Sequence, residues 1–249
     1  MEGRTELTWK QQLTRWQLWR HRTDLVFLAQ HFGTDKWGRH WYARNYQHHF
    51  APRRTDRLTI LEIGVGGYHE LEKGGASLRL WKAYFPNARI FGLDLFDKRA
   101  LEEERIRIFQ GSQDDPAVIA SLVAETGPLD IVIDDGSHDN VQVRTTFELL
   151  FPHVREGGIY VAEDLQTSYW PKFRGSLDPD ASTTSMAFFK RLADGLNHAE
   201  RIEPGYTPTF LDLNVKSLHF YHNMVFVYRG ANDEGSNLLK NNVPPDWIV

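Results

Sequence analysis

The sequence contains no cysteine among its 249 residues. Disulfides, thiolate zinc sites and a cysteine nucleophile are therefore excluded, and any bound metal must be held by oxygen or imidazole. Oxygen-rich sites favour magnesium, calcium or manganese. No apolar run approaches the ~20 residues that a membrane-spanning helix needs, and the N-terminus lacks the apolar region of a signal peptide. We therefore expect a cytoplasmic protein that makes no contact with a membrane.

A strong excess of one charge is also missing, since the formal net charge is only −4. A hydrophobic fraction of 41% with 25% charged residues is ordinary for a globular chain, so one core with elaborations is expected. The charge is unevenly distributed, because residues 1–54 carry ten Lys and Arg against four Asp and Glu, whereas the rest carries nineteen against twenty-nine.

Tryptophans interleave with this basic N-terminal segment, which we define as residues 1–57. Stacking rings beside cations can form a nucleic-acid surface, but the overall acidity of the chain argues against such a partner. Trp9, Leu13 and Trp16 have the i, i+4, i+7 spacing of an apolar helix face. We expect that face to pack on the core or on a second subunit of a homo-oligomer.

Short apolar runs alternate with helical patterns from residue 58 onward. Strands are expected at residues 58–64, 88–94, 105–111, 129–135 and 157–164, with helices at 77–85, 116–125 and 140–154. This alternation predicts a parallel sheet with right-handed crossovers. Residues 217–230 hold two more apolar stretches divided by His222 and Asn223, which we interpret as closing antiparallel strands. The predicted fold class is α/β: a mostly parallel seven-stranded sheet with helices on both faces and an antiparallel C-terminal strand.

The expected organisation has three parts. Residues 1–57, helical over 6–32, pack on a domain formed by residues 58–230, and residues 231–249 form a polar tail. Within the domain, residues 165–214 interrupt the alternation and are rich in Pro, Gly, Asp and Ser. They predict a loop-rich insertion around one helix near 185–201, lying over the strand ends as a substrate lid.

Glycines at the end of the first predicted strand indicate a cofactor-binding loop. Gly64 and Gly66 stand where the chain must turn tightly and let a ligand touch its backbone. Asp94 ends the second strand, where a carboxylate can accept both hydroxyls of a ribose. A plain strand-to-helix turn is the alternative for the glycines alone.

Two departures argue against a nicotinamide dinucleotide. Gly64, Gly66 and Gly67 lack the third glycine of the G-x-G-x-x-G pattern, and Asp94 follows Gly64 by 30 residues rather than the roughly 20 expected. A nucleoside cofactor without phosphate, such as S-adenosylmethionine, fits better. The predicted cofactor-binding residues are Glu62, Gly64, Gly66, Ser77, Asp94, Ser112, Gln113 and Asp134, with Glu62 and Ser77 at the amino acid end and Ser112 and Gln113 at the adenine.

Three carboxylates end two neighbouring predicted strands: Asp135 the fourth, and Glu163 and Asp164 the fifth. Acids this close repel one another unless a cation neutralises them, so the pattern predicts a divalent metal site. Because adjacent residues of a regular strand face opposite ways, Glu163 and Asp164 can share an ion only if the strand breaks there. The alternatives are helix caps or pairs with arginines.

His138 follows Asp135 by three residues and can face the same cavity. A neutral imidazole can take a proton from a hydroxyl that a metal has acidified, which makes His138 the predicted general base. His219 and His222 could instead be metal ligands, although an aromatic run beside a turn more often packs.

With these motifs in hand, the chain resembles the class I S-adenosylmethionine-dependent methyltransferases. More narrowly, it is similar to the metal-dependent sugar O-methyltransferases of antibiotic and polysaccharide biosynthesis. The likeness is carried by residues 32–36 with His40 and Tyr42, by residues 61–67, by Asp94, by IDDGSH at 133–138, by residues 162–164 and by residues 217–230. It implies a Rossmann-like fold, magnesium on Asp135, Glu163 and Asp164, and His138 as the base.

The expected reaction is in-line transfer of a methyl group from S-adenosylmethionine to a sugar hydroxyl of a glycoside or polysaccharide. Magnesium would hold two neighbouring hydroxyls and lower the pKa of one. A catechol-type methyltransferase acting on a phenol is the alternative enzyme. A non-catalytic nucleoside-binding regulatory protein is the alternative from another class.

Overall fold

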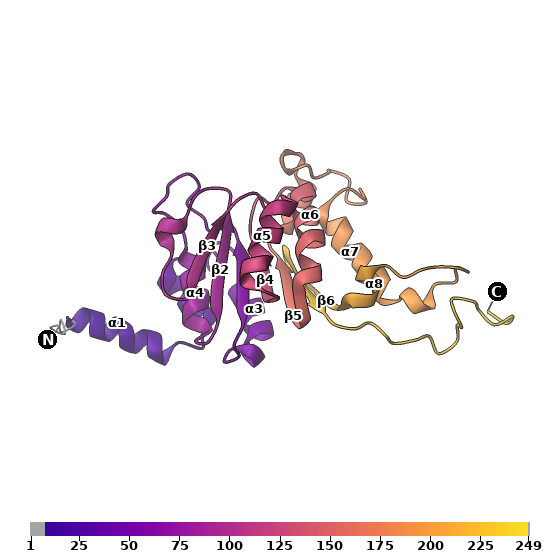
Figure 1. The fold of residues 1–249 in the computed structure, drawn as a ribbon, viewed down its shortest axis with the longest axis horizontal. Coiled ribbons are helices and arrows are strands. Elements are labelled where there is room, and N and C mark those ends of the chain that lie inside the picture. The colour runs from indigo at the N-terminus through magenta and orange to yellow at the C-terminus, as the bar shows by residue number, and fades with distance from the viewer. Residues whose placement is uncertain (1–7, 249) are drawn as a thin grey trace.

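The computed structural model describes residues 8–248 and contains one seven-stranded sheet with the order β3-β2-β1-β4-β5-β7-β6. The strands are β1 (Thr59–Ile63), β2 (Arg89–Asp94), β3 (Ile106–Gln110), β4 (Leu129–Asp134), β5 (Val154–Ala162), β6 (Val215–Tyr221) and β7 (Met224–Arg229). Strands β1 to β5 pair in parallel, whereas β7 runs antiparallel between β5 and β6. The predicted fold class is confirmed, including the antiparallel strand near the C-terminus (Figure 1).

Helices cover both faces of this sheet. They are α1 (Trp9–Arg20), α2 (Leu25–Phe32), α3 (Ala43–Phe50), α4 (Ala76–Tyr84), α5 (Pro116–Thr126), α6 (Asn140–Leu150), α7 (Ser185–Leu196) and α8 (Phe210–Asn214). Single-turn 3-10 helices lie at η1 (Ala51–Arg53), η2 (Arg99–Leu101), η3 (Phe151–His153), η4 (Leu165–Tyr169), η5 (Pro171–Phe173) and η6 (His198–Glu200). Helices α2, α3 and α4 share one buried cluster with the sheet, and α5, α6 and α7 share the other.

The alternation of side chains along each strand decides which residues reach which layer. On β4, Ile131 and Ile133 belong to the cluster beneath α2, α3 and α4, whereas Val132 belongs to the cluster beneath α5, α6 and α7. The same alternation on β5 places Val161 in the first cluster and Tyr160 in the second. Polar residues just beyond the strand ends continue this alternation.

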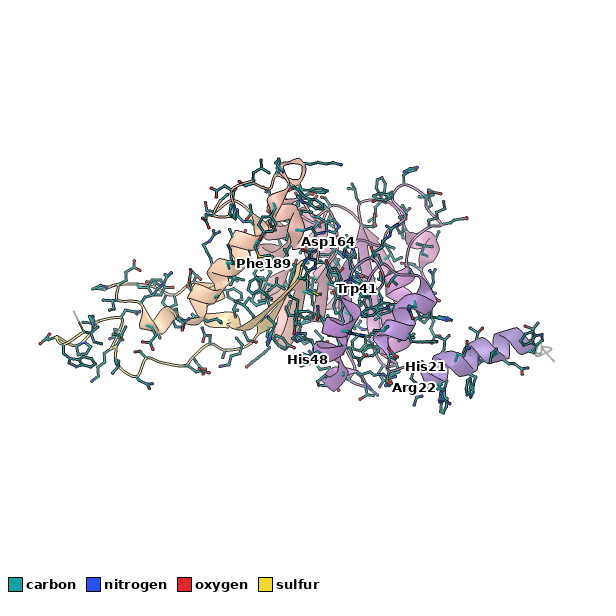
Figure 2. The ribbon with its side chains drawn as sticks, turned by 180° about the vertical axis from the view of Figure 1, so that it is seen from behind. His21, Arg22, Trp41, His48, Asp164 and Phe189 are labelled. Carbon is teal, nitrogen blue, oxygen red and sulfur yellow. The ribbon has the colours of Figure 1, made fainter. Side chains whose placement is uncertain are left out.

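Helix α1 differs from the prediction in length and packing. The expected helix over residues 6–32 is two helices within the described chain, because Asp24 accepts a hydrogen bond from the amide of Phe27 and starts α2 anew; residues 6 and 7 lie outside the described range. Trp9, Leu13 and Trp16 are 68%, 46% and 51% exposed, so the predicted face does not pack on the core of this chain. Helix α1 projects from the body, with His21 and Arg22 at its base (Figures 1 and 2).

The insertion at residues 165–214 contains one long helix, as expected. Helix α7 ends at Leu196 rather than near residue 201, and its Phe188 and Phe189 pack into the cluster on the α6 face of the sheet. The turn predicted at His222 and Asn223 separates β6 from β7. None of the described helices has the length and apolar character that crossing a membrane requires.

Candidate active site

A cavity of about 790 Å³ opens at the carboxyl ends of the parallel strands, within the usual ~300–1,000 Å³ of small-molecule sites. Residues at the ends of β1 and β2, residues that follow β1, β2, β3 and β4, and residues of the segment 33–39 line it. The predicted residues among them are Gly64, Gly66, Ser77, Asp94, Ser112, Gln113, Asp135 and His138. Residues predicted separately for a cofactor and for a metal are thus brought to one cavity.

The glycine loop lies directly against the end of β4. A Cβ on Gly64 would stand 2.1 Å from the carbonyl oxygen of Asp135, and Gly64 has a φ of +90° that side chains disfavour. A Cβ on Gly67 would stand 2.1 Å from the carbonyl oxygen of Lys73 within the same loop. These positions require glycine, which explains why the backbone can border the cavity so closely.

Asp94 is held in place by the backbone. Its Oδ2 accepts a hydrogen bond from the amide of Val65 at 2.9 Å, and its Oδ1 accepts one from the amide of Phe96 at 2.9 Å. An ionised carboxylate has about four acceptor positions, so capacity remains for two hydroxyl donors. The bond to Val65 also ties Asp94 to the glycine loop.

Glu62 is fully buried on β1 and does not line the cavity wall. Burial raises the pKa of this carboxyl above its usual value, while the nearby Lys36 lowers it. Its Oε1 lies 3.3 Å from Nζ of Lys36, and Ser77 and Trp81 are close enough to lower its pKa further.

Asp134, a predicted cofactor-binding residue, does not line the cavity. Its carboxylate turns away from the cavity, toward the layer of α6, and accepts hydrogen bonds from Tyr160 at 2.9 Å and from Nε2 of Gln113 at 3.1 Å. Burial raises the pKa of Asp134 to about 6. Gln113 does line the cavity, but its Oε1 accepts from the amide of Ser137 at 2.8 Å. Both side chains brace the turn after β4.

The predicted base and two of the predicted metal ligands form one group. Single ligand atoms of Asp135, His138 and Asp164 lie within 4.8 Å of one another. Nε2 of His138 is 3.9 Å from Oδ1 of Asp135 and 3.6 Å from Oδ2 of Asp164. His138 and Asp164 have left-handed φ angles of 56° and 54°, a conformation that costs energy and is concentrated at functional sites. The predicted break of the strand at Asp164 is therefore present.

Glu163, the third predicted ligand, does not join this group. Its Oε1 accepts a hydrogen bond from Nζ of Lys36 at 2.8 Å and a short one from the hydroxyl of Tyr46. Burial and the neighbouring Asp135 raise the pKa of Glu163 well above its usual range. Because both bonds use Oε1, only Oε2 is left to reach an ion.

Lys36, Tyr42 and Tyr46 are site residues that the sequence interpretation assigned no role. The hydroxyl of Tyr42 donates to Oδ1 of Asp164 at 2.6 Å, and Nδ1 of His40 lies 3.6 Å from the same oxygen. Burial would lower the pKa of Lys36, but the carboxylates around it raise that pKa well above its ordinary value. Residues 36–46 thus hold Glu163 and Asp164, the two acids that follow β5. The only sequence signal for their role was that the resemblance covered residues 32–36, His40 and Tyr42.

The structure does not support His219 or His222 as metal ligands. His219 lies on β6 with its ring 4.9 Å from that of His49 and 5.4 Å from that of Tyr228. Within the described residues, the only group with metal-ligand proximity is Asp135, His138 and Asp164, so neither His219 nor His222 belongs to a metal cluster.

The residues present fit both groups that the resemblance implies. Carboxylate oxygens suit a hard divalent cation, and Asp135 and Asp164 supply them beside the imidazole of His138. The cavity, the glycine loop and the carboxylate of Asp94 suit a nucleoside.

Comparisons with known proteins find methyltransferases. No protein-family model matches the chain. The mycinamicin VI 2''-O-methyltransferase of Micromonospora griseorubida is 48% identical over 230 residues, covering 91% of this chain and 56% of that protein. The demethylmacrocin O-methyltransferase of Streptomyces fradiae is 49% identical over 230 residues, covering 91% of this chain and 56% of that protein.

Among solved structures, the MycE methyltransferase from the mycinamycin biosynthetic pathway, in complex with Mg and SAH, superposes with a TM-score of 0.85 at 47% identity. The match covers 91% of this chain and 57% of that one. A second structure of MycE, in complex with Mg, SAH and mycinamycin VI, gives a TM-score of 0.83. The chain spans just over half the length of the relatives it matches, and over that region the fold and the resemblance are confirmed.

Proposed function

We propose that this homologue of the sugar O-methyltransferases of antibiotic pathways methylates a hydroxyl of a sugar in a glycoside, using S-adenosylmethionine and Mg²⁺. One observation carries the proposal: a single cavity joins the loop of Gly64 and the carboxylate of Asp94 to Asp135 and His138. A nucleoside-binding end and a cation-binding end with a base are the parts that metal-assisted methyl transfer requires.

The proposed site residues divide into two sets. Asp94 would accept the hydroxyls of the cofactor ribose, and Glu62 would face its amino acid end. Asp135 and Asp164 would hold the cation, with Oε2 of Glu163 as the third predicted donor. When bound, the cation lowers the pKa of a coordinated hydroxyl and fixes its orientation.

His138 would receive the hydroxyl proton as the new oxygen–carbon bond forms and the carbon–sulfur bond of the cofactor breaks. Nε2 of His138 lies 3.9 Å from Asp135 and 3.6 Å from Asp164, so the imidazole stands beside the proposed cation ligands. His138 itself has a left-handed φ of 56°, a strained backbone conformation that is concentrated at functional sites. A positioned base of this kind supplies about 10²–10⁴-fold in rate.

The acceptor class follows from the relatives, whose printed names include 2''-O-methylation of mycinamicin VI and 2'-O-methylation of a rhamnosyl tetracenomycin. We propose a deoxysugar attached to a natural product as the acceptor. No residue of 165–214 lines the cavity, although Leu165 directly follows Asp164. We retain that segment as the proposed determinant of the sugar, acting beyond the cavity mouth.

Transfer of labelled methyl groups from S-adenosylmethionine to a panel of glycosides and catechols, with magnesium or with EDTA, tests this function. We expect labelled sugar product only in the presence of magnesium. Label in catechols alone would favour the phenolic alternative, and the absence of transfer to any acceptor, despite cofactor binding by calorimetry, would favour a non-catalytic protein.

We further propose a homo-oligomer without a nucleic-acid partner, acting in the cytoplasm. The exposed tryptophans of α1, Trp9, Trp16 and Trp19, are the surface that fits a second subunit. Analytical ultracentrifugation of the protein and of a Trp16→Ser variant would test the assembly, since we expect the variant to shift toward the monomer.

A further inference from the structure

Lys36 is a fully buried cation at the centre of the acidic site. It lies in the loop between α2 and α3, and its side chain is 1% exposed. Its Nζ is 2.8 Å from Oδ2 of Asp135, 2.8 Å from Oε1 of Glu163 and 3.3 Å from Oε1 of Glu62. One ammonium group therefore contacts an acid from each of three neighbouring strand ends.

The three acids share a face of the sheet because of where they fall in the strand alternation. Ile60, Ile133 and Val161 belong to the cluster beneath α2, α3 and α4, and Glu62, Asp135 and Glu163 each stand two positions later. Strands β1, β4 and β5 are adjacent and parallel, so their carboxylates converge at one edge. Buried like charges at this separation are strongly unfavourable without a compensating cation.

We propose that Lys36 is a resident counter-cation that positions the acids of both halves of the site and shares two of them, Asp135 and Glu163, with the divalent ion. The same ammonium also contacts Glu62, which is the carboxylate assigned to the cofactor. Lys36 is a positioning residue in this account, because it contacts side chains that bind the ligands and not the ligands themselves.

The inference rests on the metal site of the proposed function but not on methyl transfer. Loss of Lys36 leaves the buried Glu62 and Glu163 and the partly buried Asp135 without a counter-charge, and it removes a positive charge beside the ion site. The acids then repel one another in the metal-free protein, whereas a bound cation relieves more repulsion than before. Loss of a residue that only fills space would lower stability by the same amount with and without metal.

The experiment measures the melting temperature of the full chain as a function of MgCl₂ concentration for the wild type and for Lys36→Met. We expect the metal-free Lys36→Met variant to melt well below the wild type. Magnesium should raise its melting temperature by more than it raises that of the wild type, with an apparent Kd at least ~10-fold lower. An equal or smaller magnesium response in Lys36→Met would overturn the inference.

Lys98 supplies a matched control, since it is a second fully buried lysine whose Nζ donates to the carbonyl oxygens of Glu70 at 2.6 Å and Lys73 at 3.0 Å. Lys98→Met should lower the melting temperature while keeping the magnesium response of the wild type. A magnesium response in Lys98→Met as large as that of Lys36→Met would also overturn the inference.

A double variant keeps the proposal testable if Lys36→Met does not fold without metal. Lys36→Met/Glu163→Gln removes one positive and one negative charge together, and we expect it to be more stable than Lys36→Met in EDTA. Equal or lower stability of the double variant would contradict the charge-balancing role. A wild type whose melting temperature does not respond to magnesium would instead overturn the metal site itself, and this inference with it.

Discussion

Asp134 and Asp135 are consecutive residues whose carboxylates lie on opposite faces of the sheet. Asp134 accepts a hydrogen bond from Tyr160 at 2.9 Å in the α6 layer, whereas Asp135 pairs with Lys36 at 2.8 Å in the layer of α2 and α3. The alternation of β4 thus separates a residue that braces the turn from a residue that faces the cavity.

This separation predicts different effects for two similar substitutions. Asp135→Asn removes a proposed magnesium ligand and should weaken magnesium binding by at least the ~10–100-fold that outer-shell changes cost. Asp134→Asn should leave the magnesium Kd near that of the wild type. Isothermal titration of both variants with MgCl₂ checks the pair, and equal losses would contradict the assignment.

His138→Ala should lower kcat by about 10²–10⁴-fold, because the substrate hydroxyl loses its proton acceptor. Binding of SAH and magnesium should persist, since other side chains hold both. His153→Ala, on the exposed turn of η3 before β5, is the control and should retain wild-type turnover. Near wild-type turnover in His138→Ala, with activity still abolished by EDTA, would remove His138 from the role of base.

Asp94→Ala should raise the Kd for SAH by ~10-fold or more, since two hydrogen bonds to a charged acceptor are lost. Its neighbour Asp97, which does not line the cavity and whose pKa is lowered to about 2 by hydrogen bonds from Arg99, supplies the control. Calorimetry should find Asp97→Ala close to the wild type. Unchanged affinity in Asp94→Ala would show that the nucleoside lies elsewhere.

Two glycine substitutions should differ in stability. Gly127 has a φ of +72° and a ψ of −168° with no atom near its absent Cβ, so Gly127→Ala should cost about 1–3 kcal/mol in unfolding free energy from backbone strain alone. Gly64→Ala adds a clash with the backbone of Asp135 and should cost more, with weaker SAH binding. Urea denaturation measures both, and a Gly64→Ala variant as stable as Gly127→Ala would contradict the close approach of loop and strand.

His49 makes stability depend on pH. Burial, with help from His219 and His48, lowers its pKa to about 4, and its ring nitrogens bond the hydroxyls of Tyr228 and Tyr221. Because the unfolded chain binds this proton near pH 6.5 and the folded protein only near 4, the contribution to stability is present at neutral pH and is lost as pH falls through that window. The difference in unfolding free energy between wild type and His49→Phe should therefore shrink from pH 7 to pH 4. A constant difference would refute this effect.

Much of the fold could be predicted because the strands carry strong local signals. Runs such as LDIVID are long, apolar and bounded by turn residues, so β4 and its terminal acids were expected where they occur. Asp94 was likewise predictable, since its role depends on its place at a strand end. These features depend on residues close together in sequence.

Lys36 and the orientation of Glu163 were not predictable in this way. The two side chains are 127 positions apart, and their contact depends on how α2 and α3 pack across the sheet. Asp135, Glu163 and Asp164 have no cation beside them in the sequence, which suggested a metal. In the structure, Lys36 neutralises part of their charge. For α1 the sequence left two partners open, the core or a second subunit, because periodicity identifies an apolar face but not what covers it.

The most direct test of the account is a crystal structure of the protein grown with SAH and MnCl₂, with anomalous diffraction recorded for manganese. We predict one anomalous peak between the carboxylates of Asp135 and Asp164, next to SAH whose ribose hydroxyls reach Asp94. A cavity with SAH bound but no peak between these two acids would contradict the account.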